Sequence, residues 1–353
     1  NARYEHAVIL PKRNSVAQQV VLLSLFILAI YTLLGFGLSV TGYFIYNYNP
    51  IFLTLPLIIA FISINHTLDR YSNRVKDYKL MSAQRMAKST MESLTSVSIG
   101  FFAAFRQGLI VGSFCGYFSA TVLLLFRYMT ALKFALKFAS KRKITAVAKR
   151  YRNFPKFNMP HALLNSASAN IPIVLIPLFY GSATLGFYAF GLRIIQAPLG
   201  LVSQSVYNVL SQKFAELHGQ GKDLRPLFWS TLKKLGVIAL GVSPILVLAD
   251  DIFSIVFGAE WRIAGEYIQI LAIWILLSFA ISCFAAIPMI YHQQRKALIL
   301  EILYTLARIT PFLIGSYYFS LDIKDVLLYY ATLSTLILVY GISWYYHLIK
   351  CNA

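Results

Sequence analysis

Acidic side chains are scarce in this sequence of 353 residues, where 13 Asp and Glu stand against 32 Lys and Arg. Charged residues make up only 13% of the chain, and hydrophobic residues make up 58%. The water-facing surface of a soluble protein of this length needs more charge than that. This composition argues against a soluble enzyme. The net charge of +19 could suggest a polyanion as partner, but it arises from the position of Lys and Arg between the predicted spans, as shown below.

Cysteine and histidine are too few and too scattered to form a recognisable site. The three cysteines are far apart, at Cys115, Cys283 and Cys351, and the six histidines show no HxxxH or HExxH spacing. The chain also has no GxSxG, P-loop or GxGxxG sequence. We therefore predict no disulfide framework, metal site, cofactor or catalytic activity.

Long segments without Asp, Glu, Lys or Arg dominate the chain. The longest covers residues 14–68, and others follow at 107–126, 157–192, 194–212, 267–294 and 326–349. About 20 apolar residues are enough for a helix to cross a bilayer, where each charge is costly. The sequence predicts an all-α polytopic membrane protein with ten spans, near residues 17–43, 50–67, 90–105, 107–126, 160–180, 185–211, 232–249, 267–290, 297–319 and 326–348. A turn at 46–50 divides the longest segment.

The Lys and Arg residues fall mostly in alternate loops between these spans. If the N-terminal segment is cytoplasmic, 27 of them lie on the cytoplasmic side, and only Arg106, Arg262 and Lys324 lie in the opposite loops. The positive-inside rule then predicts that both ends of this chain are cytoplasmic. The remaining two, Arg193 and Arg308, fall within spans.

A basic stretch separates four spans from six. We expect an N-terminal lobe at 1–130, a basic cytoplasmic or interfacial linker at 131–156, and a C-terminal lobe at 157–353. Lys133, Lys137 and Lys141 recur every four residues among apolar neighbours. This pattern suits a short helix on an anionic lipid surface, and a solvated linker with snorkelling lysines is the alternative.

Ionisable residues within spans usually face a wet cavity or a partner. At about 100° per residue, one side of the helix that carries Arg193 also carries Gln196, Gly200, Ser203, Gln204, Tyr207, Asn208 and Ser211. Another span places Glu301, Tyr304, Thr305 and Arg308 on one face. Around the third span, Ser89, Glu92, Ser96 and Arg106 align if that helix is continuous.

The span at 160–180 adds Asn165, Ser166, Ser168 and Asn170 before Pro172 and Pro177, which are expected to kink the helix. One interpretation of these polar stripes is a hydrophilic cavity in which arginine binds phosphate oxygens. The other is that acidic and basic residues only neutralise each other between packed helices. The candidate substrate-binding residues are Arg193, Arg308, Gln196, Gln204, Asn165 and Glu301.

Three segments carry a family resemblance. They are Arg3-Tyr-Glu-His-Ala-Val-Ile-Leu-Pro-Lys12, the block from Phe154-Pro155 through Pro172 to Gly186–Pro198, and Phe257-Gly258-Ala-Glu-Trp261. These segments resemble the Wzx-type oligosaccharide flippases of the multidrug/oligosaccharidyl-lipid/polysaccharide exporter superfamily.

The resemblance implies a two-lobed bundle of six and six helices, of which this chain would hold about four and six and lack the first two. It implies that a polyprenyl-pyrophosphate-linked oligosaccharide crosses the bacterial inner membrane by alternating access, for polysaccharide or O-antigen biosynthesis. Arg193 would hold the pyrophosphate. Other membrane proteins of polysaccharide assembly are expected partners.

Two other classes of function remain open. A cation-coupled multidrug antiporter of the same superfamily needs cavity carboxylates, for which Glu92 and Glu301 are the candidates. A membrane-embedded glycan polymerase or acyltransferase needs a large external loop or a catalytic His and Asp pair. The longest predicted external loop covers only residues 250–266.

Overall fold

A computed structural model describes residues 2–11, 13–46, 53–102 and 108–351, and within these ranges the chain forms helices and turns but no strand. The predicted all-α fold is confirmed. Lys12, Arg106 and residues 47–50 of the predicted turn lie outside the described residues.

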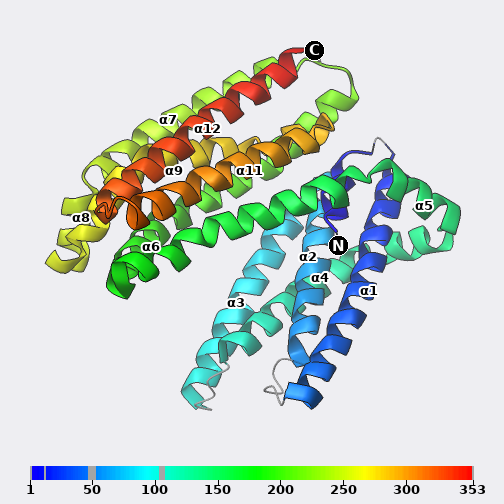
Figure 1. Ribbon diagram of the computed structural model, residues 1–353. Helices are drawn as coiled ribbons and strands as arrows, with labels where there is room; N and C mark the ends of the chain where they lie inside the picture. The colour runs from blue at the N-terminus through cyan, green and yellow to red at the C-terminus, as the bar shows by residue number, and fades with distance from the viewer. Residues whose placement is uncertain (1, 12, 47–52, 103–107, 352–353) are drawn as a thin grey trace. The chain divides into compact units, whose positions relative to one another are not determined.

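The chain divides into two compact units, Asn1–Lys156 and Phe157–Ala353. The N-terminal unit contains a short 3-10 helix, η1 (Tyr4–Ile9), and helices α1 (Asn14–Tyr46), α2 (Leu55–Arg74), α3 (Tyr78–Phe102), α4 (Gly108–Lys137) and α5 (Lys141–Arg150). The C-terminal unit contains α6 (Met159–Gly219), α7 (Arg225–Val247), α8 (Ala249–Phe257), α9 (Arg262–Cys283), α10 (Ile287–Ile290), α11 (Gln294–Thr310) and α12 (Ile323–Cys351) (Figure 1). Short π-helical turns at Phe154–Asn158 and Pro311–Ser316 and a 3-10 turn at Ala259–Trp261 join some of these helices.

Seven helical segments in the described part of the chain are long and apolar enough to cross a membrane. They contain α1, α4, α6, α7, α9, α11 and α12, whereas the more polar α2 and α3 are not among them. The segment with α6 covers 66 residues, Phe154–Gly219, and a single crossing needs only about 20. Gly181, with φ of 84°, interrupts its helical backbone, so the two spans predicted at 160–180 and 185–211 lie on either side of this break.

Part of the first segment that carries the family resemblance is buried in the N-terminal unit. Ala7 and Val8 are fully buried, and Arg74 at the end of α2 donates to the carbonyl oxygens of Val8 (3.2 Å) and Ile9 (3.0 Å). Burial, Arg70 and Arg3 together hold the pKa of His6 well below its usual range. The imidazole is then neutral, and its Nε2 can accept the 2.7 Å hydrogen bond from Arg3.

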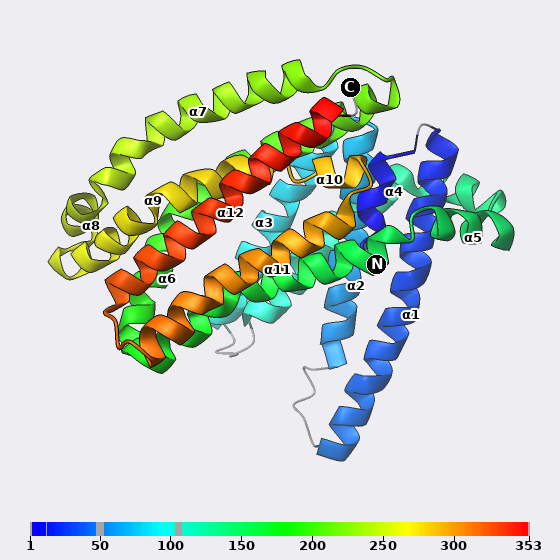
Figure 2. The same cartoon turned by 45° about the horizontal axis from the view of Figure 1, so that its top comes forward.

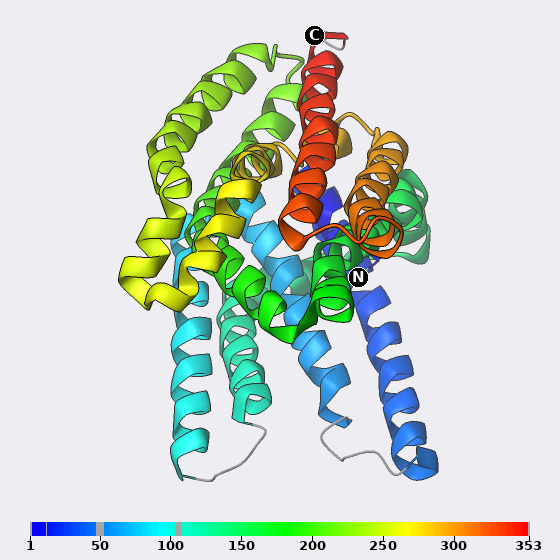
Figure 3. The ribbon, with the colours of Figure 1, turned by 60° about the vertical axis from the view of Figure 1, so that its left-hand side comes forward.

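Helices α3 and α4 pack closely, as Figure 3 shows in cyan and blue-green. The polar stripe predicted on the third span faces this contact, because Ser113 on α4 donates to Glu92 (2.9 Å) and Lys88 lies 3.7 Å from the same carboxylate. Glu92 therefore has a structural role between neighbouring helices.

The basic stretch contains two helices rather than one. Lys133 and Lys137 lie on the last turns of α4, and Lys141 begins α5, so the three lysines do not share the single short helix suggested by their spacing. Both helices belong to the N-terminal unit.

In the C-terminal unit, α6, α9, α11 and α12 lie against one another (Figure 2). The break at Gly181 is fixed by Tyr180, whose hydroxyl donates to the carbonyl of Leu321 (2.9 Å) and lies 2.8 Å from Ser316 Oγ. The break follows Pro177 by four residues, and glycine is the residue that tolerates a positive φ. Because of this break, the two halves of α6 each contribute a face to the C-terminal unit.

The close approach of α3 and α4 makes Gly116 sensitive to substitution. A Cβ there would lie 2.9 Å from both the Lys88 carbonyl oxygen and Glu92 Cβ. We predict that Gly116→Ala lowers stability by about 1 to 3 kcal/mol, because the helices must separate. The melting temperature of the purified protein in detergent measures this effect. Gly100→Ala on α3 is the matched control, since nothing lies within 4 Å of its Cβ position; equal melting temperatures for the two variants would contradict the prediction.

Candidate functional site

A cavity of about 470 Å³ lies inside the C-terminal unit, between α6, α9, α11 and α12. Its volume is within the range of about 300 to 1,000 Å³ that is typical of small-molecule sites. Its polar and aromatic lining consists of His161, Asn165, Gln196, Ser278, Ser282, Glu301 and Arg308 together with Tyr188, Trp274, Tyr304, Tyr330, Trp344 and Tyr345. This lining is unusual in a unit whose helices are otherwise apolar.

Helical periodicity explains how single faces reach the cavity. In the first half of α6 the lining residues His161, Asn165 and Ala169 recur every four residues, and in the second half Tyr188, Leu192 and Gln196 do the same. Glu301, Tyr304 and Arg308 form the corresponding face of α11.

Glu301 is 7% exposed and has two polar neighbours from α6. Asn165 Nδ2 donates to its Oε1 at 3.2 Å, and His161 Nε2 lies 3.5 Å from its Oε2. A buried carboxylate needs such partners, since an isolated one is very costly to remove from water. Glu301 is thus an acceptor whose charge is compensated when His161 is protonated.

Arg308 is 6% exposed and is held mainly by aromatic rings. Its guanidinium carbon lies 4.6 Å from the ring centroid of Tyr304, 5.4 Å from that of Trp274 and 5.7 Å from that of Tyr330. Such contacts offset part of the cost of burying the cation. They do not replace a counter-ion.

The hydrogen-bonding capacity of Arg308 is only partly used. Nη1 donates to Ser168 Oγ at 3.1 Å, whereas Nε is buried without a hydrogen-bond partner. Among the described residues, no carboxylate lies within ion-pair distance of this guanidinium, and Glu301 lies closer to His161. Arg308 therefore brings to the cavity a cation without a direct ion pair, on which Glu301 acts only through longer-range electrostatics.

A second contact fixes the aromatic wall. Trp274 Nε1 on α9 donates to the hydroxyl of Tyr304 at 2.8 Å, and both side chains are buried. The ring of Tyr304 thus faces Arg308 while its oxygen is held by the neighbouring helix. A small residue at Gly341 keeps α12 close, because a Cβ there would lie 2.8 Å from Ile281 Cδ1.

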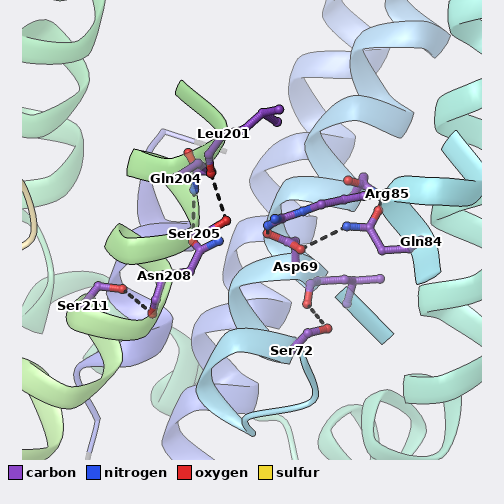
Figure 4. A network of polar contacts seen from close by, with 11 residues as sticks. Asp69, Ser72, Gln84, Arg85, Leu201, Gln204, Ser205, Asn208 and Ser211 are labelled. Atoms are coloured by element: carbon purple, nitrogen blue, oxygen red, sulfur yellow. Dashed lines mark hydrogen bonds and ion pairs between the residues drawn. The ribbon is translucent and has the colours of Figure 1, made fainter. Parts of the chain in front are cut away.

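The structure separates the six predicted site residues into two groups. Asn165, Gln196, Glu301 and Arg308 line the cavity, whereas Arg193 and Gln204 do not. Arg193 is exposed, and Gln204 donates to Asn208 Oδ1 one turn further along α6 (3.0 Å, Figure 4). The cavity-facing side of the second half of α6 carries Tyr188, Leu192 and Gln196, and Leu192 lies about 100° around the helix from Arg193.

The N-terminal unit has its own polar cluster between α2 and α3. Gln84 donates to Asp69 at 3.1 Å, and Arg85 is directed at the same carboxylate at 3.5 Å (Figure 4). Asn65 donates to Gln84 Oε1 at 3.1 Å. These contacts satisfy one another within the unit.

Several lining residues were not singled out from the sequence as site residues. His161 lacks a partner at metal-ligand or catalytic spacing, and Tyr188, Trp274 and Tyr330 look like ordinary apolar positions. The available signal was the recurrence of His161 and Asn165 at i and i+4. Within the described part of the chain, no three His, Cys, Asp or Glu side chains are grouped to hold a metal ion.

Comparison with known proteins places these features in context. Residues 15–266 match the family described as polysaccharide biosynthesis protein. The teichuronic acid biosynthesis protein TuaB of Bacillus subtilis is 26% identical over 206 residues, which are 50% of this chain and 42% of that protein. The chain thus spans less than half the length of this curated relative.

Solved transporter structures share the fold. An outward-facing multidrug resistance MATE transporter of the MOP superfamily matches with a TM-score of 0.74 and 15% identity, over 99% of this chain and 83% of that chain. A MOP superfamily transporter from Pyrococcus furiosus gives 0.74 and 14% over the same shares, and the Vibrio cholerae MATE transporter VcmN gives 0.72 and 13% over 99% and 84%. At these identities the likeness shows the fold alone, and it confirms the predicted two-lobed helical architecture.

The Trp274 to Tyr304 contact generates a test of the cavity wall. We predict that Tyr304→Phe lowers stability by about 1 to 3 kcal/mol, because the buried indole N–H loses its acceptor. Thermal unfolding of the purified protein measures the loss. Tyr340→Phe, at a 53% exposed position on α12, is the control and is expected to unfold like wild type. The same melting temperature for both variants would show that the hydrogen bond does not hold the wall.

Proposed function

Because the chain belongs to the polysaccharide biosynthesis protein family, we propose that it is part of a flippase for polyprenyl-pyrophosphate-linked oligosaccharides. The substrate crosses the bacterial inner membrane by alternating access, without covalent change. The observation that carries this proposal is the polar cavity of about 470 Å³ inside a membrane-embedded helical unit. Polar groups in hydrocarbon are expensive and persist where they serve a substrate path.

Each kind of cavity residue suits a different part of the substrate. Arg308 supplies a cation for an oxyanion of the substrate, since its guanidinium makes no direct ion pair in the described part of the chain. Asn165, Gln196 and Glu301 offer amide and carboxylate groups to sugar hydroxyls. The rings of Trp274 and Trp344 provide flat apolar surface for the faces of the sugars.

In the same proposal, Arg193 and Gln204 contact the substrate outside the cavity. Arg193 is exposed, and neither residue lines the cavity, so we assign them contacts with the substrate on the surface of α6. Arg193 makes no ion pair with a carboxylate in the described part of the chain, which leaves its guanidinium available to the pyrophosphate.

The setting follows from the same proposal. The chain lies in the inner membrane with both ends cytoplasmic, as the distribution of Lys and Arg favours. It works without a cofactor, next to other membrane proteins of polysaccharide assembly. The relative's name, teichuronic acid biosynthesis protein, is consistent with such a setting.

A cation-coupled multidrug antiporter is the second candidate, and Glu301 beside His161 favours it, because a cavity carboxylate can bind a cation. Arg308 weighs against it, since a buried guanidinium in the same cavity, with no direct ion pair among the described residues, repels cationic drugs. Drug-resistance assays separate the two functions: the flippase confers no resistance.

Export of glycan tests the role of Arg308. We predict that Arg308→Gln lowers the amount of lipid-linked glycan reaching the outer leaflet at least about tenfold, because a charged hydrogen bond to the substrate is lost. Arg308→Lys keeps the charge and is expected to retain part of the activity. Arg225→Gln, at an exposed position outside the cavity, is the control. Wild-type export by an Arg308→Gln protein present at normal amounts would rule out this role.

Arg193 needs a separate test. We predict that Arg193→Ala reduces export while the melting temperature stays at the wild-type value, because the side chain is exposed and makes no structural contact in the described part of the chain. Export assays and thermal unfolding on the same preparation provide both measurements. Unchanged export would remove Arg193 from the substrate path, and a large loss of stability would assign it a structural role.

A further inference from the structure

The last part of the N-terminal unit is rich in Lys and Arg and contains no Asp or Glu. No Asp or Glu occurs between Glu92 and Glu216, and the stretch 127–156 carries ten Lys and Arg. Helix α5, Lys141–Arg150, contains five of them in ten residues. The transport path described above uses none of these residues.

One face of α5 is already occupied by the N-terminal unit. Val147 is 6% exposed, α5 lies against α1, and the Tyr4 hydroxyl donates to the carbonyl of Ala148 at 3.3 Å. Tyr151 and Phe154, which follow the helix, are also buried. The apolar side of α5 is therefore fixed, and its opposite side is directed outward.

The outward side presents a basic depression. Lys141, Arg142, Thr145, Ala146 and Lys149 border it, and all five are exposed. Lys141, Arg142 and Lys149 make no ion pair within the described residues, whereas Arg127 on α4 is engaged by Asp77 at 3.4 Å. Three cations around one depression form a surface for oxyanions.

The neighbouring end of α4 adds exposed apolar groups. Phe134 and Phe138 are 58% and 50% exposed, and their ring centroids lie 4.6 Å apart. Lys143 Nζ donates to the carbonyl of Phe138 at 3.1 Å, and Ser140 caps α5, so the basic helix is held beside these rings. Aromatic side chains next to basic ones are typical of the boundary between hydrocarbon and headgroups.

The position of α5 in the chain indicates what its outward face meets. Helix α4 is a candidate membrane span that runs to Lys137, and α5 begins only four residues later. Helix α1 is another candidate span, and Figure 1 shows α5 beside its N-terminal end. A helix in this position meets the bilayer surface.

We propose that the outward face of α5 binds the phosphate headgroups of anionic phospholipids in the adjacent leaflet, with Lys141, Arg142 and Lys149 as the contacts. Phe134 and Phe138 insert between the acyl chains nearby. This surface anchors the N-terminal unit to the bilayer, and it goes beyond the proposed transport of glycan, on which it does not depend.

Lipid retention by the purified protein tests the proposal. Native mass spectrometry in detergent measures the binding of phosphatidylglycerol and, in parallel, of phosphatidylcholine with the same acyl chains. We expect the wild type to prefer phosphatidylglycerol. Lys141→Gln/Arg142→Gln/Lys149→Gln is expected to bind it about 100-fold more weakly, because three basic contacts are lost. Its melting temperature should not change, since the three side chains are exposed and unpaired in the described structure.

Two triple variants serve as controls. Lys141→Arg/Arg142→Lys/Lys149→Arg preserves the charge and is expected to bind phosphatidylglycerol like the wild type. Lys222→Gln/Lys233→Gln/Lys234→Gln removes the same charge from exposed positions of the C-terminal unit and is expected to lose much less binding. Equal losses in both charge-removing variants would show that net charge alone attracts the lipid, and full retention by the α5 variant would show that this face does not bind it. Either result overturns the proposal.

Discussion

Burial of a charge in a membrane-embedded helical unit is the constraint on which the rest of this structure depends. The apolar segments exclude Lys, Arg, Asp and Glu almost completely, so the few exceptions must be compensated locally. Glu301 obtains compensation from Asn165 and His161, and Arg308 obtains only part of it, from three aromatic rings and Ser168. What remains is a cavity with a hydrogen-bonded acceptor, an incompletely satisfied cation and aromatic walls. That combination is costly in an apolar unit and is useful for binding a polar, negatively charged substrate.

Much of the fold could be predicted because its causes are local. The absence of charge over about 20 residues marks most of the spans. Pro172 and Pro177 predict a kink in α6, whereas the break itself lies at Gly181, which was not singled out from the sequence. Contacts between helices were harder to predict from the sequence. The polarity of α2 and α3 keeps them out of the seven most apolar segments, and the stripe around Glu92 serves the contact between α3 and α4, where Ser113 satisfies the carboxylate. Periodicity shows that residues share a face, but it cannot show which neighbour this face meets.

Because periodicity does not show which neighbour a helix face meets, only part of the site could be predicted. Asn165, Gln196, Glu301 and Arg308 were found from polar residues in apolar helices, and they converge on one cavity. Arg193 was the most prominent residue of its stripe, yet the cavity receives the adjacent face of α6, through Tyr188 and Leu192. A rotation of about 100° separates the two faces, and neighbouring helices decide which one is enclosed. His161 and the tyrosines gain their importance only from residues that are distant in the sequence and close in the fold.

The central claim is that the glycan passes through the cavity of the C-terminal unit. Its most direct test is photo-crosslinking to radiolabelled lipid-linked glycan in membranes, with a photoreactive amino acid replacing Gln196 in the cavity or Leu240, a 73% exposed position on α7 outside it. The account predicts labelled adducts from position 196 in a transport-competent protein and none from position 240. Transport without a cross-link from position 196, or equal cross-linking from both positions, would contradict it.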